Sequence, residues 1–129
     1  MFSFRFGIGS AVIALMALSS GGAAAQGSPE AGKSPVPATP DSIATGKQTY
    51  LRRCASCHAA SGEGGPGNDL IPAAPSLVDE QVKVKTDSQV FNNIKNGIGP
   101  DFNMVSFKDT LKDDEIWNVV NYLRSISKK

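Results

Sequence analysis

Residues 54–58 are Cys54-Ala55-Ser56-Cys57-His58, and they carry the clearest chemistry in this 129-residue chain. Two thiols three positions apart, followed directly by an imidazole, form the pattern that attaches a c-type haem. The spacing places both sulfurs under the same edge of the porphyrin, and the adjacent imidazole reaches the iron as its proximal ligand. The sequence therefore predicts one covalent haem c, with Cys54 and Cys57 as thioethers and His58 on the iron.

Three other kinds of site use closely spaced cysteines. A thioredoxin-like redox pair expects a cytosolic chain with a βαβ pattern, whereas no hydrophobic strands flank this motif. A closed zinc site needs four Cys or His ligands, and the chain holds 2 Cys and 1 His. A structural disulfide between Cys54 and Cys57 would close only a tiny loop. Because His58 is the single histidine and stands where the motif requires it, haem attachment is the preferred interpretation.

The first 25 residues have the composition of an export signal. Arg5 precedes an apolar run over residues 8–18, and small residues over 23–25 suit cleavage after Ala25. The apolar run is shorter than the roughly 20 residues of a spanning helix, so the sequence predicts a cleaved signal peptide and no transmembrane span in the mature chain. Since c-type haem is attached outside the cytoplasmic membrane, the predicted location in a bacterium is the periplasm.

Residues 26–40 separate the predicted signal peptide from the folded part. They contain four prolines and almost no large apolar side chain, which predicts a loose, partly extended linker. Residues 41–129 then form one domain, which is small for an independent hydrophobic core and would gain an apolar centre from a haem. With 13 Lys and Arg against 12 Asp and Glu in the whole chain, nothing points to nucleic acid as a partner.

The first predicted helix begins after residue 40, with Asp41 or Ser42 as its N-cap. Small and apolar residues recur at helical spacing up to the haem motif. We therefore expect this helix to deliver Cys54 at its end and to leave Cys57 and His58 in the turn beyond.

A glycine- and proline-rich loop over residues 59–75 is predicted to wrap the proximal side of the haem. A ligating histidine donates its other ring N–H to a carboxylate or a backbone carbonyl, which fixes its tautomer. We expect the carbonyl of Pro75 to accept this bond from His58, with Pro66 as the weaker alternative. Apolar side chains of the same segment are candidates for packing on the porphyrin, namely Leu70, Ile71 and Leu77.

Two further helices are predicted, and the fold class is all-α because no alternating strand pattern of useful length occurs. One helix follows a capping box formed by Thr86 and Gln89 and ends at Gly97 as a left-handed C-terminal residue. The last helix has acidic residues at its start and basic residues at its end, which suits the helix dipole. Its apolar stripe consists of Ile116, Val119, Val120, Leu123 and Ile126.

Met104 is the candidate for the second iron ligand. It lies in the loop between the last two predicted helices and is the one methionine left after removal of residues 1–25. A methionine is more often a flexible core filler than a ligand, but here the proximal site is identified and no second histidine exists. We therefore expect Met104 to bind the iron, with a five-coordinate iron or a lysine nitrogen as alternatives.

Residues 42–126 resemble the class I cytochromes c, which hold one haem between a histidine and a methionine. The features that carry the resemblance are the haem motif, Gly46 and Tyr50 before it, the run 75–77, the turn 96–99, Met104 and the run 114–124. The resemblance implies three main helices and loops wrapped around one covalent haem. It also implies that the first and last helices cross, with Gly46 and Tyr50 against Trp117 and Tyr122.

Two positions depart from the common pattern of that family. Val105 stands where proline often follows the ligand methionine. Lys112 stands where serine often precedes the acidic start of the last helix, so Thr110 is an alternative cap. Class II bundles fit less well, because they carry the haem motif near the C-terminus and most of this domain follows His58.

The predicted function is that of a periplasmic electron carrier rather than an enzyme. An iron with both axial positions filled, by His58 and Met104, changes oxidation state with little rearrangement and leaves no open site for substrate. Its partners would be a donor dehydrogenase and an acceptor oxidase or reductase. Lysines that are candidates for steering an acidic partner, or alternatively form an ordinary solvated face, are Lys83, Lys85, Lys95 and Lys108.

Three alternatives stay open at this point. The same haem domain would serve as a subunit bound permanently to a larger periplasmic oxidoreductase. A gas-binding sensor or small enzyme would need an open iron position. The weakest alternative is a structural protein without haem, which a mass measurement excludes or establishes.

Overall fold

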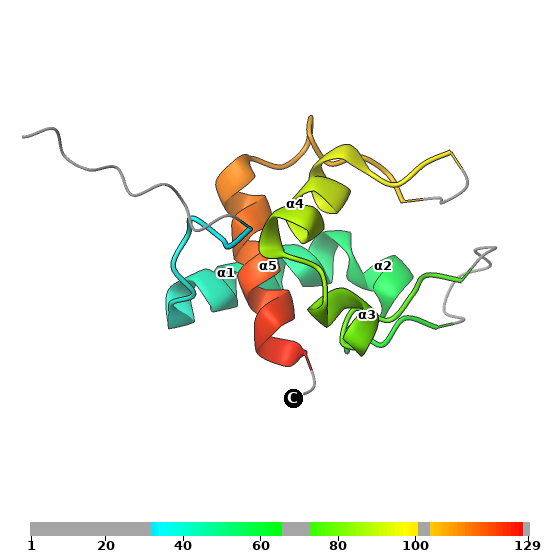
Figure 1. Ribbon diagram of the computed structural model, residues 1–129, viewed down its shortest axis with the longest axis horizontal. Helices are drawn as coiled ribbons and strands as arrows, with labels where there is room; N and C mark the ends of the chain where they lie inside the picture. Colours follow the sequence, from blue (N-terminus) through cyan, green and yellow to red (C-terminus); the bar gives the residue numbers. More distant parts are fainter. Residues whose placement is uncertain (1–31, 66–72, 101–103, 128–129) are drawn as a thin grey trace, which may run out of the picture.

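The computed structural model describes residues 32–65, 73–100 and 104–127. Its helices are α1 (Pro40–Arg53), α2 (Ala55–His58), α3 (Glu80–Lys83), α4 (Asp87–Asn96) and α5 (Asp113–Ile126) (Figure 1). Within these ranges the only β-structure is an isolated antiparallel bridge between Ile98 and Met104, so the predicted all-α class is confirmed. No helix in the described ranges is long and apolar enough to cross a membrane. The predicted signal peptide, Pro66, Leu70 and Ile71 lie outside the described residues.

Helices α1 and α5 cross near the middle of the molecule (Figure 1). The backbones approach closely, because a Cβ atom built on Gly46 would lie 1.9 Å from the carbonyl oxygen of Asn118. One turn further along α1, the rings of Tyr50 and Tyr122 pack with their centroids 5.3 Å apart. The crossing that the family resemblance implied is present, and it depends on the missing side chain of Gly46.

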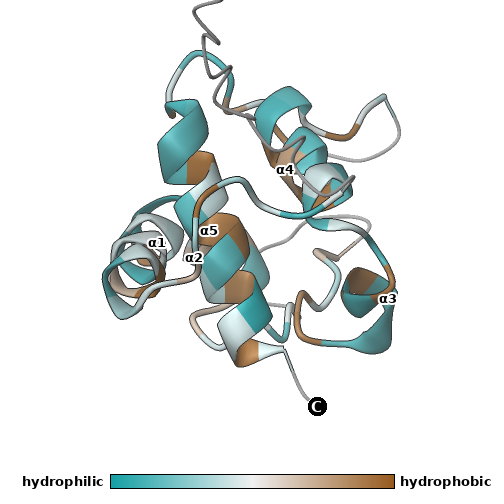
Figure 2. Ribbon diagram, turned by 60° about the vertical axis from the view of Figure 1, so that its left-hand side comes forward, coloured by the Kyte–Doolittle hydropathy of each residue, from teal (hydrophilic) through white to brown (hydrophobic). Residues whose placement is uncertain are grey.

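Trp117 has a different aromatic partner from the one expected. It stacks on Phe91 of α4, with ring centroids 4.1 Å apart, rather than on a residue of α1. Helix α5 thus presents one face to α1 and another to α4. Hydrophobic and hydrophilic residues alternate along it in Figure 2, and its apolar residues Ile116, Val119, Val120 and Leu123 are buried. The buried core contains Tyr50, Val82, Val90, Phe91, Ile94, Leu111, Ile116, Val119, Val120, Tyr122 and Leu123.

Replacement of Gly46 by alanine is expected to lower the free energy of unfolding by about 1–3 kcal/mol. Alanine favours a helix by about 1 kcal/mol over glycine, but here its Cβ would overlap a backbone carbonyl that cannot rotate away. The crossing helices must therefore separate. Urea unfolding of the haem-loaded protein measures the loss. Thr45→Ala, at an exposed position of the same helix, is the control, and a higher midpoint for Gly46→Ala would contradict the prediction.

The N-cap of α1 differs from the expected Asp41 or Ser42. The cap is Thr39, whose Oγ1 accepts a hydrogen bond of 3.1 Å from the backbone N–H of Ser42. The hydroxyl of Ser42 is occupied elsewhere: it donates to Asn118 Oδ1 at 2.6 Å and accepts from Asn121 Nδ2 at 2.9 Å. The Ser42 hydroxyl, which the local sequence predicts as a helix cap, is therefore engaged by tertiary hydrogen bonds to α5.

Helix α4 begins as predicted. Thr86 Oγ1 accepts from the N–H of Gln89, and the Gln89 side chain accepts from the N–H of Thr86, which completes the capping box. The helix ends at Gly97 with φ of +74° but an extended ψ of −179°, so this residue is not in the left-handed helical conformation expected. A Cβ at Gly97 would lie 2.7 Å from the carbonyl oxygen of Met104, which explains why glycine is required.

Helix α5 is capped by Lys112, whose backbone N–H donates to Glu115 Oε2 at 2.9 Å. The alternative cap, Thr110, does not serve this role, since its hydroxyl contacts the carbonyl of Phe107 at 3.4 Å. A lysine can stand at this position because the glutamate three residues later satisfies the exposed N–H.

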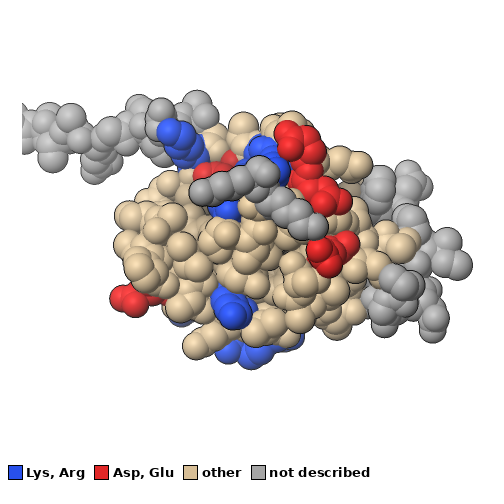
Figure 3. Space-filling model, turned by 90° about the horizontal axis from the view of Figure 1, so that it is seen from below, with Lys and Arg blue, Asp and Glu red and all other residues tan. Residues whose placement is uncertain are grey.

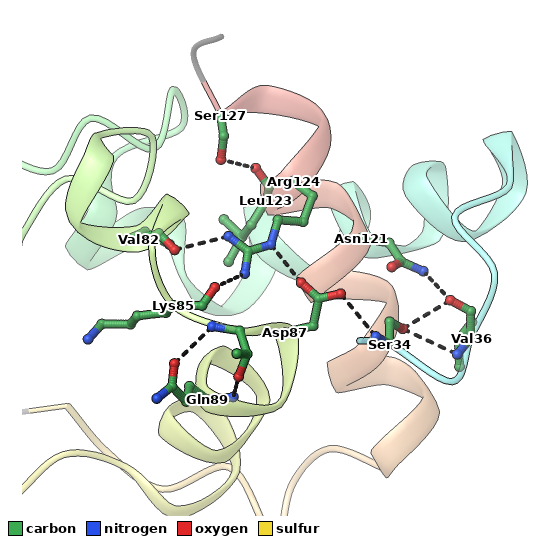
Figure 4. A network of polar contacts seen from close by, with 11 residues as sticks. Ser34, Val36, Val82, Lys85, Asp87, Gln89, Asn121, Leu123, Arg124 and Ser127 are labelled. Carbon is green, nitrogen blue, oxygen red and sulfur yellow. Dashed lines mark hydrogen bonds and ion pairs between the residues drawn. The ribbon is translucent and has the colours of Figure 1, made fainter. Parts of the chain in front are cut away.

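The described end of the predicted linker packs against the domain, whereas the sequence predicts a loose segment. Asn121 Nδ2 on α5 donates to the carbonyl of Val36 at 3.0 Å (Figure 4) and to that of Pro37 at 3.3 Å. The backbone N–H of Ser34 donates to Asp87 Oδ2 on α4 at 2.9 Å. Because Asn121 is only 4% exposed, its amide needs protein acceptors, and the carbonyls of this segment supply them.

Candidate haem site

The haem motif continues the chain from α1 into a second short helix. The backbone N–H of Cys54 donates to the carbonyl of Tyr50 at 2.8 Å, and those of Cys57 and His58 donate to the carbonyl of Cys54 at 3.1 and 2.9 Å. The expected turn is therefore the single helical turn α2. It directs the two cysteines and the histidine to the same pocket.

His58 is 9% exposed, and its Nδ1 lies 3.1 Å from the carbonyl oxygen of Pro75, which is the contact that the sequence predicts. A proton on Nδ1 is held by this carbonyl, so the lone pair of Nε2 is the one available to a metal. Among the described residues, Nε2 makes no hydrogen bond. The imidazole is thus oriented in advance by the loop that follows it.

The loop after the haem motif contains glycines at positions where another part of the backbone passes too close for a side chain. The N–H of Leu77 donates to the carbonyl of Gly62 at 2.7 Å, and the N–H of Gly64 donates to the carbonyl of His58 at 3.0 Å. Gly64 has φ of +69°, and a Cβ there would lie 2.4 Å from the carbonyl of Ala74. These hydrogen bonds bring the segment that contains Pro75 and Leu77 back alongside the imidazole of His58.

One apolar pocket collects the predicted site residues. Cys54, Cys57, His58, Pro75 and Met104 all line it. The backbone of Met104 is held by a hydrogen bond of 3.1 Å from the N–H of Ile98, and its side chain is partly buried against the core. The apolar walls come from the segments between the haem motif and the end of the chain: Leu77, Val82, Val90, Ile94, Ile98, Phe107, Val119 and Leu123.

These residues fit a haem c. Two thiols, one imidazole with a free Nε2 and a thioether sulfur converge on walls of aliphatic and aromatic side chains. Thiols are the groups that bond covalently to haem vinyls, and imidazole with thioether is an axial pair found in cytochromes c. The alternative of a redox-active dithiol fits less well. Burial, with a smaller contribution from Cys57, raises the pKa of Cys54 to about 11, whereas reactive cysteines have lowered pKa values.

Four polar or charged side chains also line the pocket: Tyr50, Arg53, Asn93 and Lys85. None of the first three was predicted from the sequence to belong to the site itself. Asn93 was detectable, because it stands one helical turn after Val90 on the apolar side of its helix. Tyr50 was singled out only for the helix crossing, yet its hydroxyl donates to the carbonyl of Ala59 at 2.7 Å.

Replacement of Tyr50 by phenylalanine is expected to lower the free energy of unfolding by about 1 kcal/mol, the net value of one hydrogen bond. Burial raises the pKa of Tyr50 above its ordinary value, so the hydroxyl stays protonated and donates to Ala59. Ala59 itself has φ of +61° and depends on such anchoring. Tyr122→Phe is the matched control, because the described residues give the Tyr122 hydroxyl no hydrogen bond. If urea unfolding showed an equal loss of unfolding free energy for both variants, the role of the Tyr50 hydroxyl as an anchor would be contradicted.

The four predicted steering lysines do not act as one group. Lys85 lines the pocket, but Lys83 pairs with Glu80 at 3.5 Å. Lys95 pairs with Asp113 at 2.8 Å and lies 5.5 Å from the centre of the Phe91 ring. On the face shown in Figure 3, charged side chains of both signs stand in small groups around a largely uncharged centre.

Comparison with known proteins gives consistent matches to c-type cytochromes. The family model described as cytochrome c oxidase, cbb3-type, subunit III matches residues 41–123. The solved structure of the KustC0563 c-type cytochrome is 28% identical, with a TM-score of 0.54 over 64% of this chain and 98% of that one. No curated protein matches significantly.

Two further structures share the fold at lower identity. Cytochrome cL from the marine bacterium Methylophaga aminisulfidivorans is 24% identical, with a TM-score of 0.56 over 70% of this chain, and the match spans 59% of that protein. A chain of the Kuenenia stuttgartiensis reducing HAO-like protein complex is also 24% identical, with a TM-score of 0.57 over 73% of this chain and 47% of that one. Since the family match covers most of the chain and includes the entire pocket from Tyr50 to Leu123, the protein belongs to the cbb3-type cytochrome c oxidase subunit III family, within the class I c-type cytochromes that carry electrons.

Proposed function

We propose that this protein is a periplasmic one-electron carrier in which His58 and Met104 are the axial ligands of a single haem c. The observation that carries the proposal is that both side chains line the pocket that Cys54 and Cys57 also line. A haem with both axial positions filled supplies a one-electron couple without an open coordination position for substrate.

The chain contributes orientation and exclusion of water. The carbonyl of Pro75 holds the Nδ1 proton of His58, which aims Nε2 into the pocket and raises its basicity as a ligand. The aliphatic walls around it include Val119 and Leu123 of α5, which are 1% and 4% exposed. A thioether ligand and a dry pocket both favour the reduced state, so the reduction potential should be high for a haem protein.

Export supports the periplasmic part of the proposal. Residues 1–25 have the composition of a cleaved signal peptide, and covalent attachment of haem c takes place on the far side of the cytoplasmic membrane. N-terminal sequencing of the protein purified from a bacterial periplasm is expected to begin at Gln26. A protein retained in the cytoplasm with Met1 in place would contradict this location.

A second candidate is a haem c subunit held permanently in a larger oxidoreductase. The matching family is named for an oxidase subunit, and one structure of the same fold comes from a protein complex. We favour the free carrier, because a haem with both axial positions filled needs only brief encounters with its partners, and transient redox encounters use small interfaces. Copurification of a stoichiometric partner at native abundance would favour the subunit instead.

Redox titration of the purified protein, followed by its visible spectrum, tests the carrier itself. We expect a reversible transition that fits one electron, and a reduced form that does not bind carbon monoxide at neutral pH. Rapid carbon monoxide binding would show an open iron position and would favour a gas-binding sensor. A polypeptide mass without a haem addition would exclude both the electron carrier and the gas-binding sensor.

A further inference from the structure

Arg124 of α5 makes three hydrogen bonds to one stretch of chain, residues 82–87, which runs from α3 into α4 (Figure 4). Its Nε donates to Asp87 Oδ1 at 2.7 Å, its Nη1 to the carbonyl of Val82 at 3.0 Å, and its Nη2 to the carbonyl of Lys85. The side chains of Arg124 and Asp87 are only 27% and 21% exposed. The guanidinium therefore donates its hydrogen bonds to protein acceptors at a partly buried position. Such bonds stabilise the fold more than an ion pair at a fully exposed surface does.

The segment before α1 completes this arrangement. The second carboxylate oxygen of Asp87 accepts from the backbone N–H of Ser34 at 2.9 Å. Next to it, the N–H of Ser88 donates to the carbonyl of Gly32 at 3.1 Å. We call the set of Arg124, Asp87, Ser34 and the carbonyls of Val82 and Lys85 the Arg124 clamp. It joins α3, α4, α5 and the N-terminal segment at one point.

The clamp lies directly behind one wall of the haem pocket. Val82, Lys85 and Leu123 all line that pocket, and the first two are held by their carbonyls while the third precedes Arg124 in α5. Helix α3 is a single turn of four residues, too short to be stable by itself. Its one buried residue is Val82, whereas Val84 next to it is 71% exposed, so packing fixes this part of the chain through a single side chain.

The last carbonyls of a helix lack donors within it. Here the carbonyl of Val82 also accepts from the backbone N–H of Lys85 at 3.2 Å, so Arg124 adds a second bond there and bonds the Lys85 carbonyl beyond the helix. Arginine presents five N–H donors in a fixed plane, which lets one side chain reach two carbonyls and a carboxylate together. Lysine has the same charge but cannot reproduce this fork. The position of the wall formed by Val82 and Lys85 therefore depends on the shape of Arg124 as well as on its charge.

We propose that Arg124 is a positioning residue for electron transfer: through the clamp it holds residues 82–85 against the haem and keeps water from that side of the pocket. The proposal rests on the haem-carrier function above. Exposure of a haem to solvent stabilises the oxidised state and lowers the reduction potential. Loss of the clamp should therefore shift the redox equilibrium without changing the ligands of the iron.

The test uses haem-loaded protein with Arg124→Lys or Arg124→Gln, and compares reduction potentials with the wild type. Both variants are expected to shift the equilibrium toward the oxidised state by roughly threefold, about 28 mV for a one-electron couple at 59 mV per tenfold change. Hydrogen exchange should become faster at the amides of residues 82–85. Lys95→Gln is the matched control, since it also removes a cation from an ion pair but lies outside the pocket.

The outcomes show whether the shape of the Arg124 side chain or only its charge affects the reduction potential. A wild-type potential in Arg124→Lys would overturn the proposal, because charge alone would then suffice, and so would an equal shift in Lys95→Gln. If Arg124→Gln fails to fold, Asp87→Asn removes the same ion pair by another route, and an unchanged potential and exchange rate there would also overturn it. A wild-type protein without haem would overturn the proposed function together with this inference, whereas a normal wild type with unchanged variants overturns the inference alone.

Discussion

Protein with Cys54→Ala and Cys57→Ala together is expected to have the mass of the bare polypeptide, with covalent haem lost completely. No other thiol exists in the chain, so nothing can replace the two thioether bonds. The domain is small, and its central pocket is lined by apolar side chains that would face water without the haem. We therefore expect the double variant to lose most of its helical structure as well.

Mass spectrometry and haem staining of denatured protein measure the attachment, and far-ultraviolet circular dichroism measures the helices. Ser56→Ala is the control, because it changes a residue between the two cysteines and leaves the motif intact. Each single cysteine variant should retain haem through its remaining thioether in reduced yield. A haem-sized mass addition in the double variant would refute the assignment of the motif.

Replacement of Met104 by leucine is expected to abolish the far-red absorption band of iron–methionine ligation. Leucine has a similar volume and keeps the pocket filled, so stability should change by less than about 1.5 kcal/mol. The backbone bond from Ile98 to residue 104 does not involve the side chain and should persist. Loss of the sulfur ligand should lower the reduction potential on the order of 100 mV, within the span of about 0.8 V that axial ligands control.

An open position should also let the reduced Met104→Leu protein bind carbon monoxide, which the wild type is expected to refuse. Visible spectra of both oxidation states, with and without the gas, make the measurement. Met104→His is a second variant that should keep the iron six-coordinate while changing its spectrum. Persistence of the far-red band in Met104→Leu would contradict the assignment of Met104 as the ligand. Absence of the band from the wild type would favour another ligand, such as a lysine nitrogen.

Much of the fold was predictable because its signals are local. The capping box of Thr86 and Gln89 satisfies N–H groups within four residues, and the apolar stripe of α5 follows from helical periodicity. The close crossing at Gly46 was expected from the family resemblance rather than from periodicity. The contact of His58 with Pro75 spans 17 residues, yet it followed from the general need of a ligating histidine for a carbonyl partner.

Other features were not predictable because distant groups compete for the same side chain. Ser42 looks like a helix cap, but contacts with Asn118 and Asn121 engage its hydroxyl and leave the cap to Thr39. A single turn such as α3 has too few residues for a periodic signal. The proline-rich segment before α1 looks unstructured by composition, but the amide of Asn121 and the carboxylate of Asp87 hydrogen-bond to its backbone and hold part of it.

The sequence by itself determined the chemistry of this protein: a haem attachment motif with one histidine, and a single methionine after the predicted cleavage site. Those inferences need only residue type and spacing, because covalent attachment and metal ligation are properties of particular atoms. The tertiary structure alone decided that residues 34–37 pack on the domain and that Arg124 joins α5 to the wall of the pocket. Such contacts bridge up to 85 positions of the chain, and no local pattern records which carbonyl a buried donor will reach.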